Sequence, residues 1–153
     1  MRRTNIKTEL LRWLNTLNWD TELTLTFAND ISLRQAEAAL HQFWQAVDAR
    51  LYGKAARRFG KRCQRLNFVE GDGVLSRYHF HIITLCPADR FDEVEDYCGF
   101  LRALWLEKNP NNFAVSCAPI RSQQGYARYL TKQVRSDSCD ALVLDSSHIS
   151  AAH

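Results

Sequence analysis

The sequence predicts an α+β domain in which an antiparallel sheet of four or five strands carries helices on one face. Two periodicities alternate along the chain. In some stretches apolar residues recur at every second position, as in half-buried strands, and in others every three or four positions, as in amphipathic helices. With 153 residues, 46% of them hydrophobic and 24% charged, the chain is long enough to bury one core. We therefore expect a single folded unit with a mixed architecture.

The first elements follow from local patterns. Apolar residues at helical spacing predict a short helix over 4–17. Apolar side chains alternate with threonines over 22–27, which predicts a strand. Ser32 and Gln35 have the spacing of a capping box, which predicts the start of a long helix over 33–51.

The order of the later elements predicts the topology. They are strands over 66–70 and 78–85, a helix over 91–105, a strand over 113–117, a helix over 123–134 and a weak strand over 141–144. Strand, helix, strand, strand, helix, strand is the order of the ferredoxin-like or split βαβ arrangement. We expect two helices to cover one face, leaving the other for a site with the last helix across its edge. Residues 136–153, rich in Ser and Asp, are expected to form a partly flexible C-terminal extension.

His79 and His81 are the most informative residues. They lie two apart in a predicted strand, so both side chains project to one face while Phe80 projects to the other. Two imidazoles about 7 Å apart on a rigid strand can hold one divalent metal ion. A phosphoryl-transfer site usually adds a carboxylate. Glu70, which ends the preceding strand, is the best candidate if the register is right, and Asp72 in the turn is the fallback. The alternative is a histidine pair on an exposed sheet face.

Tyr126, Tyr129 and Lys132 follow one another at intervals of three on the predicted last helix, so adjacent members are neighbours on its surface. Ala127 and Leu130 mark the buried stripe, which Tyr126 flanks. Tyr129 and Lys132 lie further round, toward solvent or a neighbouring cleft. A phenol has a pKa of about 10, so it needs a nearby ammonium group or a metal-bound phosphate to attack phosphorus at neutral pH. The simpler alternative is that both tyrosines only pack.

These motifs, in this order, resemble those of the HUH endonucleases that initiate rolling-circle replication. The matching segments are Leu23-Thr24-Leu25-Thr26-Phe27, His79-Phe80-His81 and Tyr129-Leu130-Thr131-Lys132, and the resemblance spans residues 20–135. It implies that 1–135 form the nuclease domain. It also implies that His79, His81 and Glu70 bind Mn²⁺ or Mg²⁺, and that Tyr129 attacks single-stranded DNA with Lys132 assisting. The products would be a 5′-phosphotyrosine and a free 3′-hydroxyl.

Some features refine this resemblance. Tyr126 is a second tyrosine, as in two-tyrosine initiators, but it lies three residues from Tyr129 where those usually have four. The histidines precede the tyrosine, which favours a plasmid or phage replication initiator or a single-tyrosine transposase over a relaxase. The segment 53–61 lacks the spacing of a phosphate-binding loop, and Arg62 stands where that loop needs Ser or Thr. We therefore expect no ATP hydrolysis, and either a host helicase as partner or a longer initiator.

Cations cluster in one segment. Lys54, Arg57, Arg58, Lys61, Arg62 and Arg65 fall within twelve residues that contain no Asp or Glu. Clustered cations favour contact with a polyanion. With Arg128 on the last helix, they form the expected DNA-binding set. The alternative is a solvated helix end and loop.

Two other functions remain open. One is a metal-independent RNA endonuclease with His79 or His81 as general base. The other is a non-catalytic module that binds single strands by stacking bases on sheet aromatics. No apolar run is long enough to span a bilayer, the N-terminus lacks a signal-peptide pattern, and five cysteines argue against a disulfide framework. We expect a cytoplasmic protein, in a prokaryote or the host of a mobile element, that acts on single-stranded DNA at a replication origin without a membrane partner.

Overall fold

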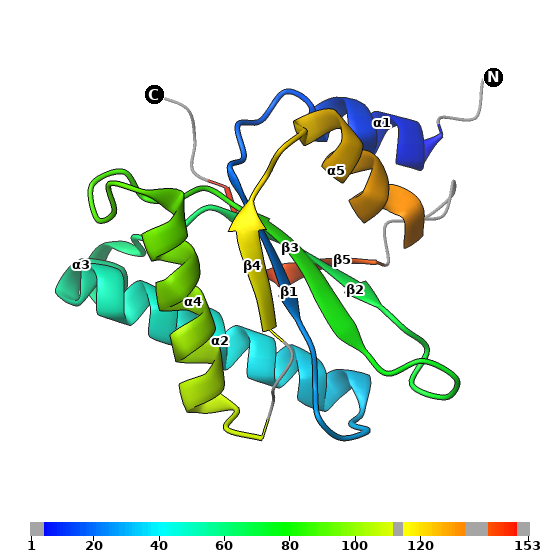
Figure 1. Cartoon of the computed structure of the whole chain (residues 1–153), viewed down its shortest axis with the longest axis horizontal. Coiled ribbons are helices and arrows are strands. Elements are labelled where there is room, and N and C mark those ends of the chain that lie inside the picture. The colour runs from blue at the N-terminus through cyan, green and yellow to red at the C-terminus, as the bar shows by residue number, and fades with distance from the viewer. Residues whose placement is uncertain (1–4, 112–114, 134–140, 150–153) are drawn as a thin grey trace.

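The computed structural model describes residues 5–111, 115–133 and 141–149 and shows an α+β fold built on one antiparallel, open sheet (Figure 1). In spatial order the five strands are β4 (Val115–Pro119), β1 (Thr21–Leu25), β3 (His79–Thr84), β2 (Arg65–Glu70) and β5 (Leu142–His148). The helices are α1 (Ile6–Leu14), α2 (Leu33–Tyr52), α3 (Lys54–Phe59), α4 (Val94–Lys108) and α5 (Gln123–Leu130), and a 3₁₀ turn, η1 (Thr131–Gln133), follows α5. The expected α+β class and the antiparallel sheet are confirmed.

Local chemistry explains where the first helices begin. The side chain of Ser32 accepts a hydrogen bond from the backbone N–H of Gln35, and the Gln35 side chain accepts one from the backbone N–H of Ser32. This is the predicted capping box at the start of α2. Asn5 caps α1 in a similar way, because its side-chain oxygen accepts from the N–H of Thr8. Helix α1 is therefore shorter than the 4–17 predicted.

One face of the sheet packs against α2 and α4 and forms the larger core. Leu23, Leu25, Phe80 and Ile82 are fully buried there, and strand β1 alternates between buried and half-buried positions as predicted. The aromatic residues that close this core are Phe27, Phe43, Trp44 and Trp105. The periodicity of the sequence thus places Phe80 and the histidines on opposite faces.

The second face carries helices as well, which differs from the expected single covered face. Figure 1 shows α1 and α5 together on one side of the sheet, with α2 and α4 on the other. Leu10 and Leu14 of α1 and Ala127 and Leu130 of α5 pack against sheet residues in a second core. These sheet residues are Leu66, Phe68 and Ile83. Because these apolar side chains alternate with those of the first face, they need a cover of their own.

The C-terminal segment contributes to the sheet. Strand β5 pairs antiparallel with β2, with a register shift between Arg65 and Asn67. It is longer than the weak strand predicted over 141–144, and it makes Leu142–His148 part of the fold. Residues 134–140 and 150–153, which belong to the predicted extension or precede it, lie outside the described residues.

Candidate metal centre

The β2–β3 hairpin decides whether Glu70 meets the histidines. Glu70 is the cross-strand partner of His79, at the turn end of the hairpin. Gly71, which opens the turn, has a φ of 104°, and a Cβ there would collide with the backbone carbonyl of Arg77. The turn therefore needs glycine at this position, and with it the strands meet in the register that puts Glu70 beside the histidines.

Asp72 builds the turn instead of serving as a ligand. Its Oδ1 accepts hydrogen bonds from three successive backbone N–H groups, those of Val74, Leu75 and Ser76, at 2.8, 2.9 and 3.1 Å. These bonds lower the pKa of the Asp72 carboxyl group. The fallback ligand is thus engaged in local structure, and Glu70 is the carboxylate of the site.

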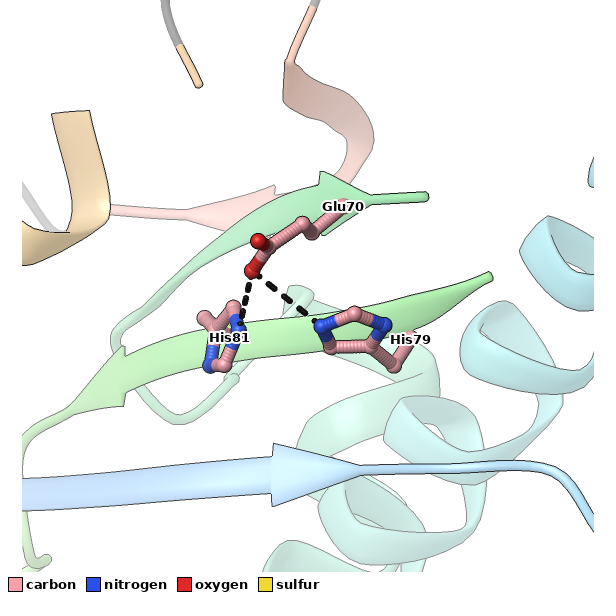
Figure 2. A group of neighbouring side chains, drawn as sticks. All are labelled: Glu70, His79 and His81. Atoms are coloured by element: carbon pink, nitrogen blue, oxygen red, sulfur yellow. Dashed lines mark hydrogen bonds and ion pairs between the residues drawn. The ribbon is translucent and has the colours of Figure 1, made fainter. Parts of the chain in front are cut away.

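Glu70, His79 and His81 converge on one point (Figure 2). Oε2 of Glu70 lies 3.1 Å from Nε2 of His79 and 2.6 Å from Nε2 of His81. The three potential ligand atoms lie within 4.8 Å of one another. The two rings meet edge to face, with centroids 4.9 Å apart. The geometry therefore joins the three residues that the sequence singled out as metal ligands.

Burial and mutual contacts set the charges of this group. Burial lowers the pKa of His81, whose side chain is only 9% exposed, although Glu70 opposes the shift. For Glu70, burial raises the pKa of the carboxyl group, but the hydrogen bonds and charges of His81 and His79 outweigh it, and the net shift is downward. The site therefore favours an ionised carboxylate beside a neutral His81 near neutral pH.

Partners on the far side of each ring hold the imidazoles in place. Nδ1 of His79 lies 3.1 Å from the backbone oxygen of Arg77, and Nδ1 of His81 lies 3.3 Å from the hydroxyl of Thr24. Thr24 is directly opposite His81 across β1 and β3, so only the strand order reveals its role. Outer partners of this kind orient metal-ligating histidines in known sites.

The hydrogen-bond partners of His79 are compatible with a cation shared between its ring and Glu70. Because a carbonyl oxygen only accepts, the contact with Arg77 places a proton on Nδ1 of His79. In the tautomer with its proton on Nδ1, His79 turns the lone pair of Nε2 toward the carboxylate oxygen of Glu70. Two acceptors at this distance need a cation between them, either a proton or a metal ion. Two imidazole nitrogens and a carboxylate suit a divalent transition ion such as Mn²⁺, and Mg²⁺ takes such a set less readily.

Helix α5 lies on the same face of the sheet as the triad. Ala127 and Leu130 pack in one cluster with Phe68, which is the cross-strand partner of His81. Tyr126 is half-buried at the edge of that cluster. Tyr129 is part of α5, but its side chain lies outside the described part of the structure.

The remaining predicted residues near the C-terminal end of this helix are cationic. Arg128 on α5 and Lys132 in η1 are both exposed. The structure thus places the tyrosine helix and its cations on the histidine side of the sheet, while the relation of Tyr129 to the three ligands stays a prediction.

The basic segment lies elsewhere. Lys54, Arg57 and Arg58 are exposed on α3, and Arg62 is exposed in the connection to β2. Lys61 is also exposed and forms an ion pair of 3.3 Å with Asp89. All of these residues precede β2, whereas Glu70 ends it, so the segment and the triad lie toward opposite ends of that strand.

Arg65 differs from the other cations of the segment. Its side chain is 4% exposed, and Nη1 lies 2.9 Å from Oδ2 of Asp48. It also donates to the backbone oxygens of Cys63 and Ser146. Arg65 alternates with Leu66 along β2 and so faces α2. We therefore leave it out of the surface that could contact DNA.

Comparison of the chain with protein-family models, with curated proteins and with solved structures finds no significant match. The resemblance to HUH endonucleases therefore rests on the motifs and their order. Among the described residues, no helix is both long and apolar enough to cross a membrane.

Proposed function

We propose that this chain is a metal-dependent endonuclease that nicks single-stranded DNA and links the cut strand to a tyrosine. The observation that carries the proposal is the convergence of Glu70, His79 and His81 on the sheet face over which the tyrosine-bearing helix α5 packs. The strand order β4-β1-β3-β2, with α2 and α4 in the connections, supports the ferredoxin-like arrangement that the motif resemblance implies.

Each residue then has a role. Glu70, His79 and His81 would hold Mn²⁺ or Mg²⁺, which when bound would polarise the scissile phosphate. The phenol oxygen of Tyr129 attacks phosphorus and loses its proton, so that an oxygen–phosphorus bond forms. The bond from phosphorus to the 3′-oxygen breaks, and that oxygen takes up a proton as the free 3′-hydroxyl. Lys132 steadies the charged phosphate, while Thr24 keeps the His81 ring in place.

The covalent ester explains why such an enzyme can rejoin strands. Formation of the 5′-phosphotyrosine conserves the energy of the phosphodiester bond, so attack by a 3′-hydroxyl can reverse it. This chemistry suits initiation of rolling-circle replication at a plasmid or phage origin, with a host helicase to open the duplex. A single-tyrosine transposase would use the same groups.

A metal-independent RNA endonuclease is the second candidate. The 2.6 Å contact between Glu70 and His81 is also the arrangement that orients a histidine as general base. The lowered pKa of His81 keeps the ring neutral, as that role requires. Divalent-metal dependence separates the two functions.

The test is the mass of the intact protein after incubation with a randomised single-stranded DNA pool and Mn²⁺. We expect a DNA-sized increase that EDTA abolishes and that is absent in Tyr129→Phe. The matched control is Tyr126→Phe, one turn away on the same helix, which should still form the adduct. Loss of the adduct only in Tyr126→Phe would show that Tyr126, and not Tyr129, is the nucleophile. No adduct in any sample, together with RNA cleavage in EDTA, would overturn the proposal in favour of the second candidate.

A further inference from the structure

Phe59 is an exposed aromatic residue at the end of a cationic helix. It is the last residue of α3 and is 83% exposed. Gly60, with a φ of 64°, ends the helix in the left-handed conformation, and its N–H bonds to the carbonyl of Ala55. The chain therefore turns away directly after Phe59 and leaves its ring in solvent, where a large apolar side chain has no stabilising role of its own.

Three arginines near Phe59 in the sequence form no ion pair with a described carboxylate. Arg57, Arg58 and Arg62 are exposed, and among the described residues no carboxylate lies within ion-pair distance of any of them. Lys61, by contrast, pairs with Asp89. Unpaired guanidinium groups favour an anionic ligand, and phosphate is the anion that their fork geometry matches best.

A hollow beside α3 brings two of these arginines together. Arg57 and Arg62 line a cavity of about 340 Å³ together with Asp145 of β5 and polar residues of α2. Arg65 and Asp48 also line it, but they neutralise each other through their ion pair. The two free guanidinium groups therefore outweigh the one remaining carboxylate, and the wall of the cavity is net positive.

We propose that α3 and Arg62 form a second contact for single-stranded DNA, in which a base stacks on Phe59 and phosphates meet Arg57, Arg58 and Arg62. This inference rests on the proposed function for the class of its substrate. An unpaired strand fits better than a duplex, because only an unstacked base can offer its face to an aromatic ring. Aromatic rings set among cations are the usual means of binding single strands.

This contact is separate from the metal centre. Arg65 begins β2 and Glu70 ends it, so the two regions are about 16 Å apart along the strand at 3.3 Å per residue. In Figure 1, α3 lies at one end of the sheet and the β2–β3 hairpin at the other. Helix α3 would thus bind a part of the DNA strand that lies away from the phosphodiester bond that is cut.

The test measures binding of fluorescent oligothymidylate by anisotropy, in EDTA so that no cleavage occurs. Stacking of one base predicts that Phe59→Ala weakens binding about 5- to 140-fold, and that Phe59→Trp restores it. Arg57→Gln should also weaken binding and reduce the slope of log K against log salt by about 0.7, the value for one single-strand phosphate contact. Phe59→Ala should leave that slope unchanged, because it removes no charge.

Matched results decide the inference independently of nicking. His81→Ala should bind oligothymidylate like the wild type in EDTA, even though it should lose Mn²⁺-dependent adduct formation. Unchanged binding in Phe59→Ala, or no recovery in Phe59→Trp, would overturn the stacking contact. A Phe59→Ala loss seen with oligouridylate but not with oligothymidylate would overturn the choice of DNA. Failure of adduct formation alone would count against the proposed function and leave this contact standing.

Discussion

Arg65→Ala should destabilise the fold strongly, whereas Arg62→Ala should not. Removal of Arg65 leaves the carboxylate of Asp48, which is 7% exposed, without its charged partner. It also removes the hydrogen bonds that Arg65 donates to the backbone oxygens of Cys63 and Ser146. Removal of one partner from a buried ion pair costs about 3–5 kcal/mol. Such a loss would be a large part of the 5–15 kcal/mol that typically stabilises a domain.

Urea unfolding followed by circular dichroism measures this difference. With a slope of about 2 kcal/mol per molar urea, the midpoint of Arg65→Ala should fall by about 2 M. Arg62→Ala, exposed and three residues away, should change stability by less than about 0.5 kcal/mol. The double variant Asp48→Leu/Arg65→Met should recover only the part of the loss that the unpaired buried charge causes, because the backbone N–H of Cys63 still loses its bond to Asp48 and the oxygens of Cys63 and Ser146 still lose theirs to Arg65. A loss below about 1 kcal/mol in Arg65→Ala would refute the assignment of Arg65 to the interior.

Three further predictions concern the metal centre and its turn. Glu70→Gln should weaken Mn²⁺ binding, measured by isothermal titration calorimetry. The loss should be at least the 10- to 100-fold that follows when a residue holding a metal ligand in place is removed. An affinity equal to that of the wild type would refute the assignment of Glu70 as a ligand. Affinity for Mn²⁺ should fall with acidification, because protons compete with the metal ion for its ligands; in the metal-free protein, the ring of His81, followed by NMR, should titrate at lower pH than an ordinary histidine, and titration at or above the ordinary pKa would contradict this. Gly71→Ala should destabilise the protein by more than about 1 kcal/mol in thermal unfolding, because of its positive φ and the collision with Arg77. Gly99→Ala, in α4 where a Cβ meets nothing within 4 Å, should instead stabilise by about 0.5–1 kcal/mol; similar changes in the two variants would refute the account of the turn.

Local patterns predicted most of the elements and the two histidines proposed as metal ligands, but not α3, where the sequence showed only a cluster of cations. The alternation of β1 and the capping box of Ser32 and Gln35 depend on neighbours in sequence, and both appear as predicted. His79 and His81 share a face because side chains in any strand alternate. Glu70 was predicted as a third ligand only on condition of a register that brings it beside the histidines, and the Gly71–Asp72 turn supplies that register.

Other features depended on packing between distant segments. The sequence identified Arg65 as one cation among six, yet the pairing of β2 with β5 and the position of Asp48 on α2 bury it. Helices α1 and α5 cover the second face because their apolar residues meet those of β2 and β3, and no local pattern in the sequence connects these four elements. Thr24 joins the site only because β1 lies next to β3.

The sequence by itself determined the α+β class, the common face of the two histidines and the presence of a cationic segment. These properties follow from periodicity and composition, which act over a few residues. The tertiary structure alone decided that Glu70 meets both histidines, that the tyrosine helix lies on their side of the sheet, and that Arg65 is interior while Phe59 is exposed. Strand register, strand order and burial depend on the free energy of the whole packed chain, so no short stretch of sequence can specify them.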